Sequence, residues 1–140
     1  YNLDAVVRVS GDSPLIDPNL VNQMIKKFKK KNNLNLLTNT FPRTFPSGQS
    51  VEIISFKTLK KLNFMNLDQY YTEHVTNYIY NNPSKFKIQN INCDYEHLST
   101  KLSVDSNIDL QNFKKFIFSI QEDVSSLSIK KILNIWNKIL

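Results

Sequence analysis

The sequence predicts an α/β domain in which a mostly parallel sheet is flanked by helices. Short apolar, β-branched segments alternate along the chain with segments whose apolar residues recur at helical spacing, which is typical of α/β folds. The first apolar segment stops at Gly11-Asp12. A strand that ends there places a carboxylate at the carboxyl edge of the sheet, where ligands bind in open α/β sheets. The chain has 140 residues, enough for one domain with its own core.

The expected elements follow from apolar periodicity and from the residues that begin or end them. Asp17 can cap a helix with Pro18 at its first position, where a missing N–H costs nothing. Prolines and a glycine mark a loop over 40–50, and Ser106 and Asp109 form a capping box. In order, the sequence predicts a buried strand over 3–10, a helix from 18, strands over 35–38 and 51–55, a short helix over 56–62, a helix over 67–80, strands over 86–91 and 101–104, and two C-terminal helices.

The predicted helix over 67–80 carries one apolar and aromatic stripe at i, i+3, i+4 spacing. Its members are Leu67, Tyr70, Tyr71, His74, Val75, Tyr78 and Ile79. Tyrosines are enriched in protein interfaces as well as in cores. The stripe therefore suits a core, and it also suits a homodimer contact.

Composition excludes several classes of function. The net charge is +6, but a nucleic-acid interface would combine arginines and aromatics on one face. We interpret the lysines of 26–31 as the solvated side of an amphipathic helix and expect no nucleic-acid partner. Cys93 is the only cysteine, which excludes an intrachain disulfide and a Cys-rich zinc site and favours a cytoplasmic setting. No apolar run approaches the ~20 residues of a membrane-spanning helix.

Two aspartates are candidate metal ligands. Asp12 and Asp105 each end a predicted strand, in segments that both run basic, apolar, Ser, small or apolar, Asp, Ser. If the strands are parallel neighbours, the two carboxylates converge. Two hard oxygen ligands suit Mg²⁺, which takes the rest of its shell from water and substrate phosphates. The alternative is that each aspartate only caps backbone N–H groups in a turn.

Further candidate residues lie in the loop over 40–50 and after it. Arg43 offers a planar fork for a carboxylate or phosphate, and Gly48 allows a turn or a close approach to a ligand. Glu52 can accept hydrogen bonds from sugar hydroxyls. The alternatives are an ordinary surface loop and the polar side of an edge strand. Glu73 and His74 lie on or beside the apolar stripe, where a solvated glutamate and a core or interface histidine are the alternatives.

Together, these segments resemble the cytidylyltransferase family that includes the spore coat polysaccharide biosynthesis protein F group. That group is similar to CMP-Kdo and CMP-sialic acid synthetases. The matching stretches follow in order over nearly the whole chain: residues 7–18, 45–48 with 51–53, 73–76, and 102–105 with 109–110.

The resemblance implies a Rossmann-like, glycosyltransferase-A-like nucleotidyltransferase fold. It implies attack by an acceptor oxygen, typically on an acidic sugar, on the α-phosphate of CTP, with pyrophosphate leaving. Asp12 and Asp105 would be the catalytic carboxylates that hold Mg²⁺. Glu52 and the loop from Arg43 to Gly48 would border the acceptor pocket. Glu73 and His74 would serve the acceptor site or a dimer contact.

The sequence departs from the family pattern in two places. Lys101 stands among the expected substrate-binding residues where the pattern has Arg, which weakens a bidentate phosphate contact. The glycine- and arginine-containing loop that cradles the nucleotide has no counterpart. We therefore expect residues 1–140 to be a single, incomplete nucleotidyltransferase domain, the C-terminal part of a polysaccharide-biosynthesis enzyme. It would be active with Mg²⁺ at full length and inactive with CTP by itself. The alternative is a non-catalytic binding or assembly module.

Overall fold

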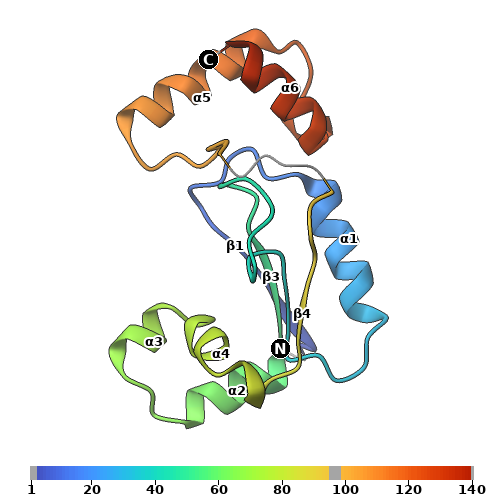
Figure 1. The fold of residues 1–140 in the computed structure, drawn as a ribbon, viewed down its shortest axis with the longest axis vertical. Helices are drawn as coiled ribbons and strands as arrows, with labels where there is room; N and C mark the ends of the chain where they lie inside the picture. Colours follow the sequence, from blue (N-terminus) through green and yellow to red (C-terminus); the bar gives the residue numbers. More distant parts are fainter. Residues whose placement is uncertain (1–2, 95–98, 140) are drawn as a thin grey trace.

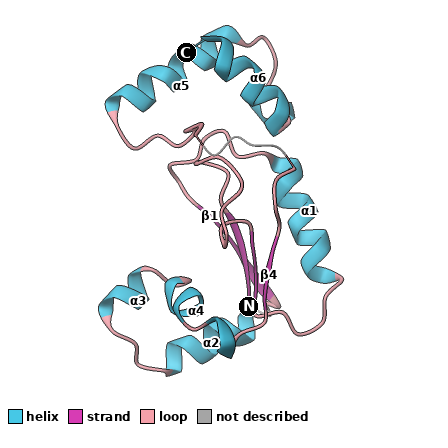
Figure 2. Cartoon of the chain, in the orientation of Figure 1, coloured by secondary structure: helices cyan, strands magenta, loops and turns pink. Residues whose placement is uncertain are grey.

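The computed structural model describes residues 3–94 and 99–139. A sheet lies at the centre, with α1 along one side and two helical lobes at its ends (Figures 1 and 2). The strands are β1 (Ala5–Val9), β2 (Leu36–Thr38), β3 (Val51–Ser55) and β4 (Ile88–Asn90). The helices are α1 (Pro18–Lys29), α2 (Phe56–Phe64), α3 (Gln69–Glu73), α4 (Asn77–Asn81), α5 (Asn107–Ser119) and α6 (Ile129–Ile139), with short 3-10 turns η1 (Pro83–Lys85) and η2 (Val124–Ser126).

The sheet is mixed, so the prediction of a mostly parallel sheet is wrong. Its strand order is β1-β3-β2-β4. β3 pairs antiparallel with both β1 and β2, whereas β2 and β4 pair in parallel. The physical reason is that β2 and β3 are joined by the loop over 39–50 without a crossover helix, and a direct return produces an antiparallel pair. The predicted α/β class, with helices flanking the sheet, is confirmed.

The first strand lies at an edge of the sheet and is not the buried strand that we expected. Val7 is 39% exposed and Val9 is 47% exposed. An apolar run by itself does not distinguish a central strand from an edge strand, because the pairing partners decide how much of it is covered. β1 pairs with β3 on one side, and β4 forms the opposite edge.

Three apolar clusters hold the described part of the chain together. One lies between α1 and the sheet, around Met24, Leu37 and Ile53. A second lies on the opposite face, where α2 and α4 pack against Leu36 and Ile54. The third fills the lobe of α5 and α6: Leu15, Leu102, Phe116, Leu127, Ile129, Ile132, Leu133 and Trp136. The sheet is therefore covered on both faces at the end near α2, while the other end meets the α5–α6 lobe.

Asp17 joins this lobe to the rest of the molecule. The predicted cap is present, since Oδ1 of Asp17 accepts a hydrogen bond from the backbone N–H of Asn19 at 2.7 Å. Its second oxygen, Oδ2, accepts from the backbone N–H of Ile129 at the start of α6, at 2.9 Å. One buried carboxylate thus satisfies the first turns of two helices that lie far apart in sequence. The capping box of Ser106 and Asp109 at the start of α5 is also confirmed.

The helix predicted over 67–80 is broken into α3 and α4. Residue His74 ends α3 with φ −109° and ψ 69°, outside the helical region. The β-branched residues Val75 and Thr76 lie at the break, and such residues fit a helix less well than most. The strand predicted over 101–104 is also absent: Lys101 forms a single parallel bridge with Ser47. None of the helices in the described ranges is both long and apolar enough to cross a membrane.

Candidate active site

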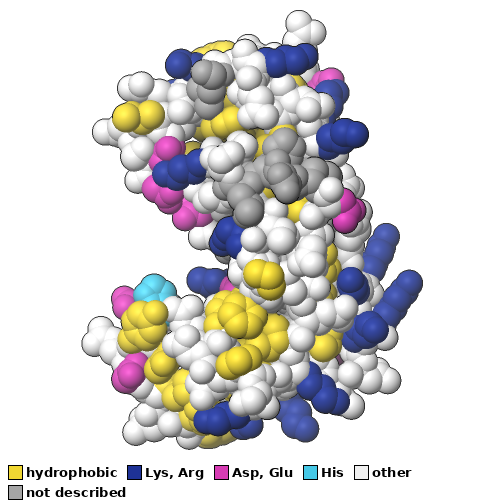
Figure 3. All heavy atoms as spheres, in the orientation of Figure 1, with side chains coloured by type: hydrophobic (Ala, Val, Ile, Leu, Met, Phe, Trp, Pro, Cys, Tyr) yellow, Lys and Arg dark blue, Asp and Glu magenta, His cyan; other side chains and the backbone are white. Residues whose placement is uncertain are grey.

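A polar pocket of about 340 Å³ opens where the sheet meets the two helical lobes. The space-filling view shows the molecule hollowed between these lobes (Figure 3). The lining comes from β1 and the turn after it, the loop over 40–50, β3, the start of α4 and the segment before α5. Apart from Gly48, every residue that lines this pocket is polar. The pocket is therefore built for a hydrophilic ligand.

The floor of the pocket is the polar end of one sheet face. Successive side chains of a strand alternate between faces, and the register aligns two cross-strand rows on this face. The first row is apolar: Val6, Ile54, Leu36 and Ile88. The parallel row, two residues away on each strand, is polar and consists of Arg8, Glu52, Thr38 and Asn90. The helices α2 and α4 cover the apolar row, and Arg8 and Glu52 of the polar row line the pocket.

Glu52 is buried in this floor, and both of its oxygens are occupied. Oε2 accepts from Nη1 of Arg8, and Oε1 accepts a short hydrogen bond from the hydroxyl of Tyr80 on α4. The same hydroxyl lies 2.9 Å from Oγ1 of Thr38 and 3.0 Å from Oγ1 of Thr40. Burial, together with the negative charge of Glu52, raises the pKa of Tyr80 to about 12. Tyr80 therefore stays protonated and available as a donor to Glu52 at neutral pH.

The two predicted metal ligands line the same pocket, although they reach it by a different route from the one expected. Asp12 lies in the turn after β1, and Asp105 follows an irregular segment and not a sheet strand. The backbone N–H of Val104 donates to the carbonyl of Asp12 at 2.8 Å. This bond, and not parallel strand pairing, brings the two aspartates to one site.

Neighbouring side chains orient each aspartate. The Ser13 hydroxyl donates to Oδ1 of Asp12 at 2.9 Å, and the Ser103 hydroxyl donates to Oδ2 of Asp105 at 3.0 Å. Lys101 also contacts Oδ2 of Asp105, at 2.9 Å. The hydrogen bond from Lys101, and to a smaller extent the one from Ser103, lowers the pKa of Asp105. Asp105 is therefore a carboxylate at neutral pH.

The donor atoms at this end of the pocket fit Mg²⁺. They are carboxylate oxygens flanked by serine hydroxyls, without sulfur or imidazole, and hard oxygen ligands select Mg²⁺ or Ca²⁺ over softer metals. Among the described residues there is no cluster of three or more His, Cys, Asp or Glu that could hold an ion. A bound Mg²⁺ would therefore complete its shell with water and substrate phosphate, which is its usual preference.

Gly48 lines the pocket where the loop over 40–50 approaches the backbone of Leu102 and Ser103. Its φ is +87°, and a Cβ at this position would lie 2.7 Å from the carbonyl carbon of Leu102 and from the nitrogen of Ser103. The close approach that the sequence indicated is thus to the chain's own backbone. It allows the N–H of Leu102 to donate to the carbonyl of Ser47 at 3.0 Å, and the Ser47 and Ser103 hydroxyls lie 2.8 Å apart.

The remaining predicted residues are divided between the pocket and its surroundings. Arg43 and Glu52 line the pocket with Gly48. Glu73 and His74 are exposed at the end of α3, outside the lining, whereas the residues of α4 that do face the pocket are Thr76, Asn77 and Tyr80. Lys101 lies in a separate hollow beside α5 and α6, where it contacts Asp109 at 2.6 Å.

Arg8 and Tyr80 are pocket residues that sequence reasoning did not select. Arg8 carried a usable signal, because it is a charge inside an otherwise apolar strand, and strand alternation places it on the same face as Glu52 if the two strands pair. The sequence around Tyr80 was misleading, because the helix predicted over 67–80 is unbroken and places Tyr80 beside its apolar stripe. The break before α4 is what turns Tyr80 toward Glu52.

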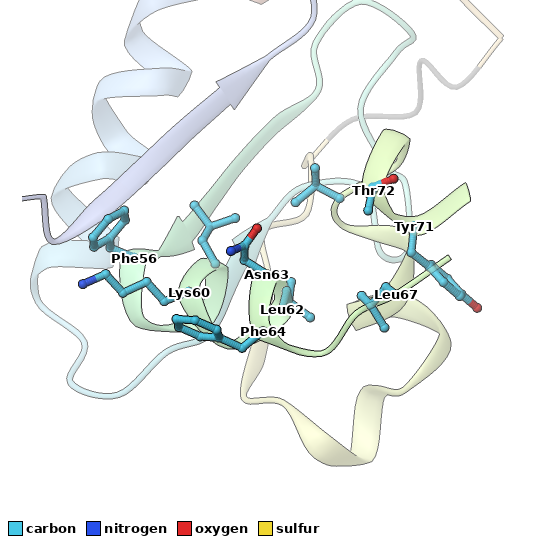
Figure 4. Close-up of a pocket in the computed structure, with 10 residues that line it drawn as sticks. Phe56, Lys60, Leu62, Asn63, Phe64, Leu67, Tyr71 and Thr72 are labelled. Atoms are coloured by element: carbon cyan, nitrogen blue, oxygen red, sulfur yellow. The ribbon is translucent and has the colours of Figure 1, made fainter. Parts of the chain in front are cut away.

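A second hollow, of about 630 Å³, lies between α2 and α3 and is mainly apolar. Figure 4 shows Phe56, Leu62, Phe64, Leu67 and Tyr71 around it, with Lys60 and Thr72 as polar neighbours. Phe64 is 83% exposed. Lys60 is the one charged residue among the described residues that line this hollow. The predicted homodimer through the stripe over residues 70–79 stays a prediction.

Comparisons with known proteins indicate the family to which the chain belongs. A family model described as "Cytidylyltransferase" matches residues 1–137. The chain is 29% identical over 143 residues to "Uncharacterized protein MJ1063" of Methanocaldococcus jannaschii, across 99% of this chain and 55% of that protein. It is 27% identical over 135 residues to spore coat polysaccharide biosynthesis protein SpsF of Bacillus subtilis, across 92% of this chain and 54% of that protein.

The fold also matches a solved structure. The structure of a cytidylyltransferase from Leptospira borgpetersenii superposes with a TM-score of 0.91 at 29% identity, covering 99% of this chain and 58% of that one. This match confirms the predicted nucleotidyltransferase fold. The chain spans about half the length of the curated relatives that it matches. Because the family model covers nearly all of the sequence, the chain belongs to the cytidylyltransferase family.

Proposed function

We propose that residues 1–140 supply the metal-binding and acceptor-binding part of a sugar cytidylyltransferase of surface polysaccharide biosynthesis. The observation that carries the proposal is the convergence of Asp12 and Asp105 in one polar pocket with Arg8, Arg43 and Glu52. Family membership supports nucleotidyl transfer. The similarity to a spore coat polysaccharide biosynthesis protein supports the biosynthetic setting. CTP and a sugar acid are the proposed substrates.

In the proposed reaction, a hydroxyl of the sugar acid attacks the α-phosphorus of CTP. A new oxygen–phosphorus bond forms, the bond to the β-phosphate oxygen breaks, and pyrophosphate leaves while the hydroxyl proton passes to solvent. Asp12 and Asp105 would hold Mg²⁺, which when bound offsets the charge of the phosphates. Ser13 and Ser103 keep the two carboxylates oriented. The chain forms no covalent intermediate, so its contribution is positioning and electrostatic stabilisation.

We further propose that the nucleotide base is bound outside this part of the enzyme. Gly11 and Gly48 are the only glycines of residues 1–140, and Gly48 packs against the chain's own backbone. A glycine-rich phosphate cradle is therefore not formed from these residues. The isolated residues 1–140 should release no pyrophosphate from CTP, and measurable release by them would contradict this.

The direct test measures pyrophosphate release by the full-length product of the gene that encodes these residues. CTP, UTP, ATP and GTP are each supplied with Mg²⁺ and a panel of sugar acids that includes Kdo and N-acetylneuraminate. We expect release that requires both CTP and one of the sugar acids, together with formation of the CMP-sugar. Equal release without a sugar acid, or a preference for another nucleotide, would contradict the proposal.

A further inference from the structure

Two groups of charged residues line the polar pocket. Asp12 and Asp105, the aspartate end, lie in the turn after β1 and in the segment before α5, whereas Arg8, Arg43 and Glu52, the arginine end, lie on the paired strands β1 and β3 and in the loop over 40–50. Asp12 is four positions after Arg8 along the chain, so their Cα atoms lie at most about 13 Å apart. The aspartate end carries two negative charges, which match a divalent cation. The arginine end carries two positive charges and one negative charge, which leaves one net positive charge.

A chain of hydrogen bonds ties the arginine end together. Arg8 is bonded to Glu52, Glu52 to Tyr80, and the Tyr80 hydroxyl to Thr40. Thr40 forms a backbone bridge with Arg43, which places that loop beside Tyr80. The side chain of Glu52 is 6% exposed, while that of Arg8 is 48% exposed. The anchoring carboxylate is therefore buried, and the guanidinium that it holds still faces the pocket.

The contacts of Glu52 indicate what it does. Each of its oxygens already accepts a hydrogen bond, so Glu52 is occupied as an anchor. Nη1 of Arg8 contacts Glu52, and a guanidinium has five N–H donors in a rigid plane. The donors directed away from Glu52 can bind a second carboxylate in the two-pronged manner that lysine does not reproduce. Holding the plane fixed before binding lowers the entropy cost of that contact.

We propose that Arg8, Glu52 and Tyr80 form a charge filter that selects acceptors with a single negative charge, such as the carboxylate of a sugar acid. Arg8 binds the carboxylate and Arg43 supplies the second positive charge. Glu52 is a positioning residue whose negative charge also cancels one of these two positive charges, and Tyr80 holds Glu52 in place. The filter rests on the proposed function for its location in the acceptor site. Its specificity is a separate property, because a pocket with two uncancelled arginines would favour a doubly charged sugar phosphate.

The test measures binding of three probes that share one pyranose ring: D-glucose, D-glucuronate and D-glucose 6-phosphate. Their dissociation constants are measured by calorimetry on the full-length protein, at fixed ionic strength and without nucleotide or Mg²⁺. We expect the wild type to bind glucuronate most tightly. Arg8→Gln should weaken glucuronate binding roughly 10- to 100-fold, as expected for loss of a charged hydrogen-bonding pair, and should leave glucose binding unchanged.

Changes at the anchor should move the preference in a stated direction. Glu52→Gln removes a negative charge from the pocket and should raise the preference for glucose 6-phosphate over glucuronate by roughly 10-fold or more. Lys60→Gln and Asp68→Asn make the same charge changes outside the pocket and serve as controls for long-range electrostatics. If Glu52→Gln does not fold, Arg8→Lys decides instead: it should keep the preference for one charge while binding glucuronate more weakly.

The outcomes separate this inference from the proposed function. A wild type without a preference for glucuronate, or an Arg8→Gln variant that keeps the preference, overturns the charge filter. If the filter is present but no sugar acid supports pyrophosphate release from CTP, the filter stands and the proposed function fails. If sugar acids are converted while Arg8→Gln keeps its selectivity, the proposed function stands and the filter fails.

Discussion

Two ends of one sheet face differ in what lies above them. At one end, Leu36 and Ile54 pack under α2 and α4 in an apolar cluster. Two residues away on the same strands, Glu52 lines a polar pocket, and Thr38 is hydrogen-bonded to Tyr80, which also lines it. Both pairs are buried, so burial does not separate structure from function here. The difference is that the buried polar pair is hydrogen-bonded to side chains that line the pocket. Thr38 is bonded to Tyr80, and Glu52 is bonded to Arg8.

This contrast gives a physical description of the site. Burying a polar group is unfavourable unless it is hydrogen-bonded, and each polar side chain buried in the described residues has a partner. The apolar end stabilises the fold by removing apolar surface from water. The polar end buries little apolar surface. Its hydrogen bonds instead fix the positions of Arg8 and Tyr80 at the pocket. The two ends should therefore respond differently to substitution.

The largest effect on stability is expected at Gly48, which lines the polar pocket. A Cβ there would lie 2.7 Å from backbone atoms of Leu102 and Ser103, at a positive φ. Gly48→Ala should therefore lower the free energy of unfolding by at least about 3 kcal/mol, as measured by urea denaturation. Gly11→Ala is the matched control, since a Cβ at Gly11 would have no atom within 4 Å. A Gly48→Ala variant as stable as Gly11→Ala would contradict the role given to this close approach.

A substitution at the apolar end should lower stability and leave ligand binding intact. Leu36 is fully buried, so Leu36→Ala should cost about 2–5 kcal/mol of unfolding free energy through lost burial and a cavity. Urea denaturation gives the cost, and calorimetry with D-glucuronate at a temperature where the variant is folded gives the binding. Loss of glucuronate binding in the folded variant would show that the two ends are not independent.

The neighbouring substitution at the polar end should show the reverse pattern. Thr38→Val keeps the shape and removes a hydroxyl that lies 2.9 Å from both Tyr80 Oη and Thr40 Oγ1. It should cost only about 1 kcal/mol in stability, while it weakens glucuronate binding because Tyr80 is no longer held in place. The comparison fails if Thr38→Val is as destabilising as Leu36→Ala and binds glucuronate normally.

The smallest effect is a pH dependence of stability at high pH. Burial and the charge of Glu52 raise the pKa of Tyr80 from 10.0 to about 12. Because the folded pKa is the higher one, the stabilisation is fully present below pH 10 and is lost as pH rises from 10 toward 12. Urea denaturation between pH 9 and 11.5 should show a steeper loss of stability in the wild type than in Tyr80→Phe. Equal slopes would show that Tyr80 is not held as described.

The sequence predicted local features well and pairing poorly. The caps at Asp17 and Ser106 depend on a few neighbouring residues, and both were correct. The direction of the sheet and the position of β1 at an edge depend on which strands meet, and apolar periodicity does not contain that information. For the same reason Arg8 was overlooked, because its importance comes from lying opposite Glu52 in the β1–β3 pair.

The candidate site follows the same division. Asp12 and Asp105 were selected from their sequence contexts, and both line the pocket. The reason offered for their convergence was wrong, since a bond from Val104 N–H to the Asp12 carbonyl brings them together. Tyr80 was missed because the helix break at residues 74–76 depends on tertiary packing as well as on local preference.

We propose that catalysis occurs in the polar pocket, and substitution of the two aspartates that line it is the sharpest test. Mg²⁺-dependent pyrophosphate release from CTP is measured for the full-length wild type, Asp12→Asn, Asp105→Asn and Asp68→Asn. Asp68 is an exposed cap of α3 outside the pocket, where asparagine caps equally well. We predict a roughly 1,000-fold loss in the first two variants, equivalent to about 4 kcal/mol, and wild-type activity in the third. Wild-type activity in either pocket variant would contradict the claim.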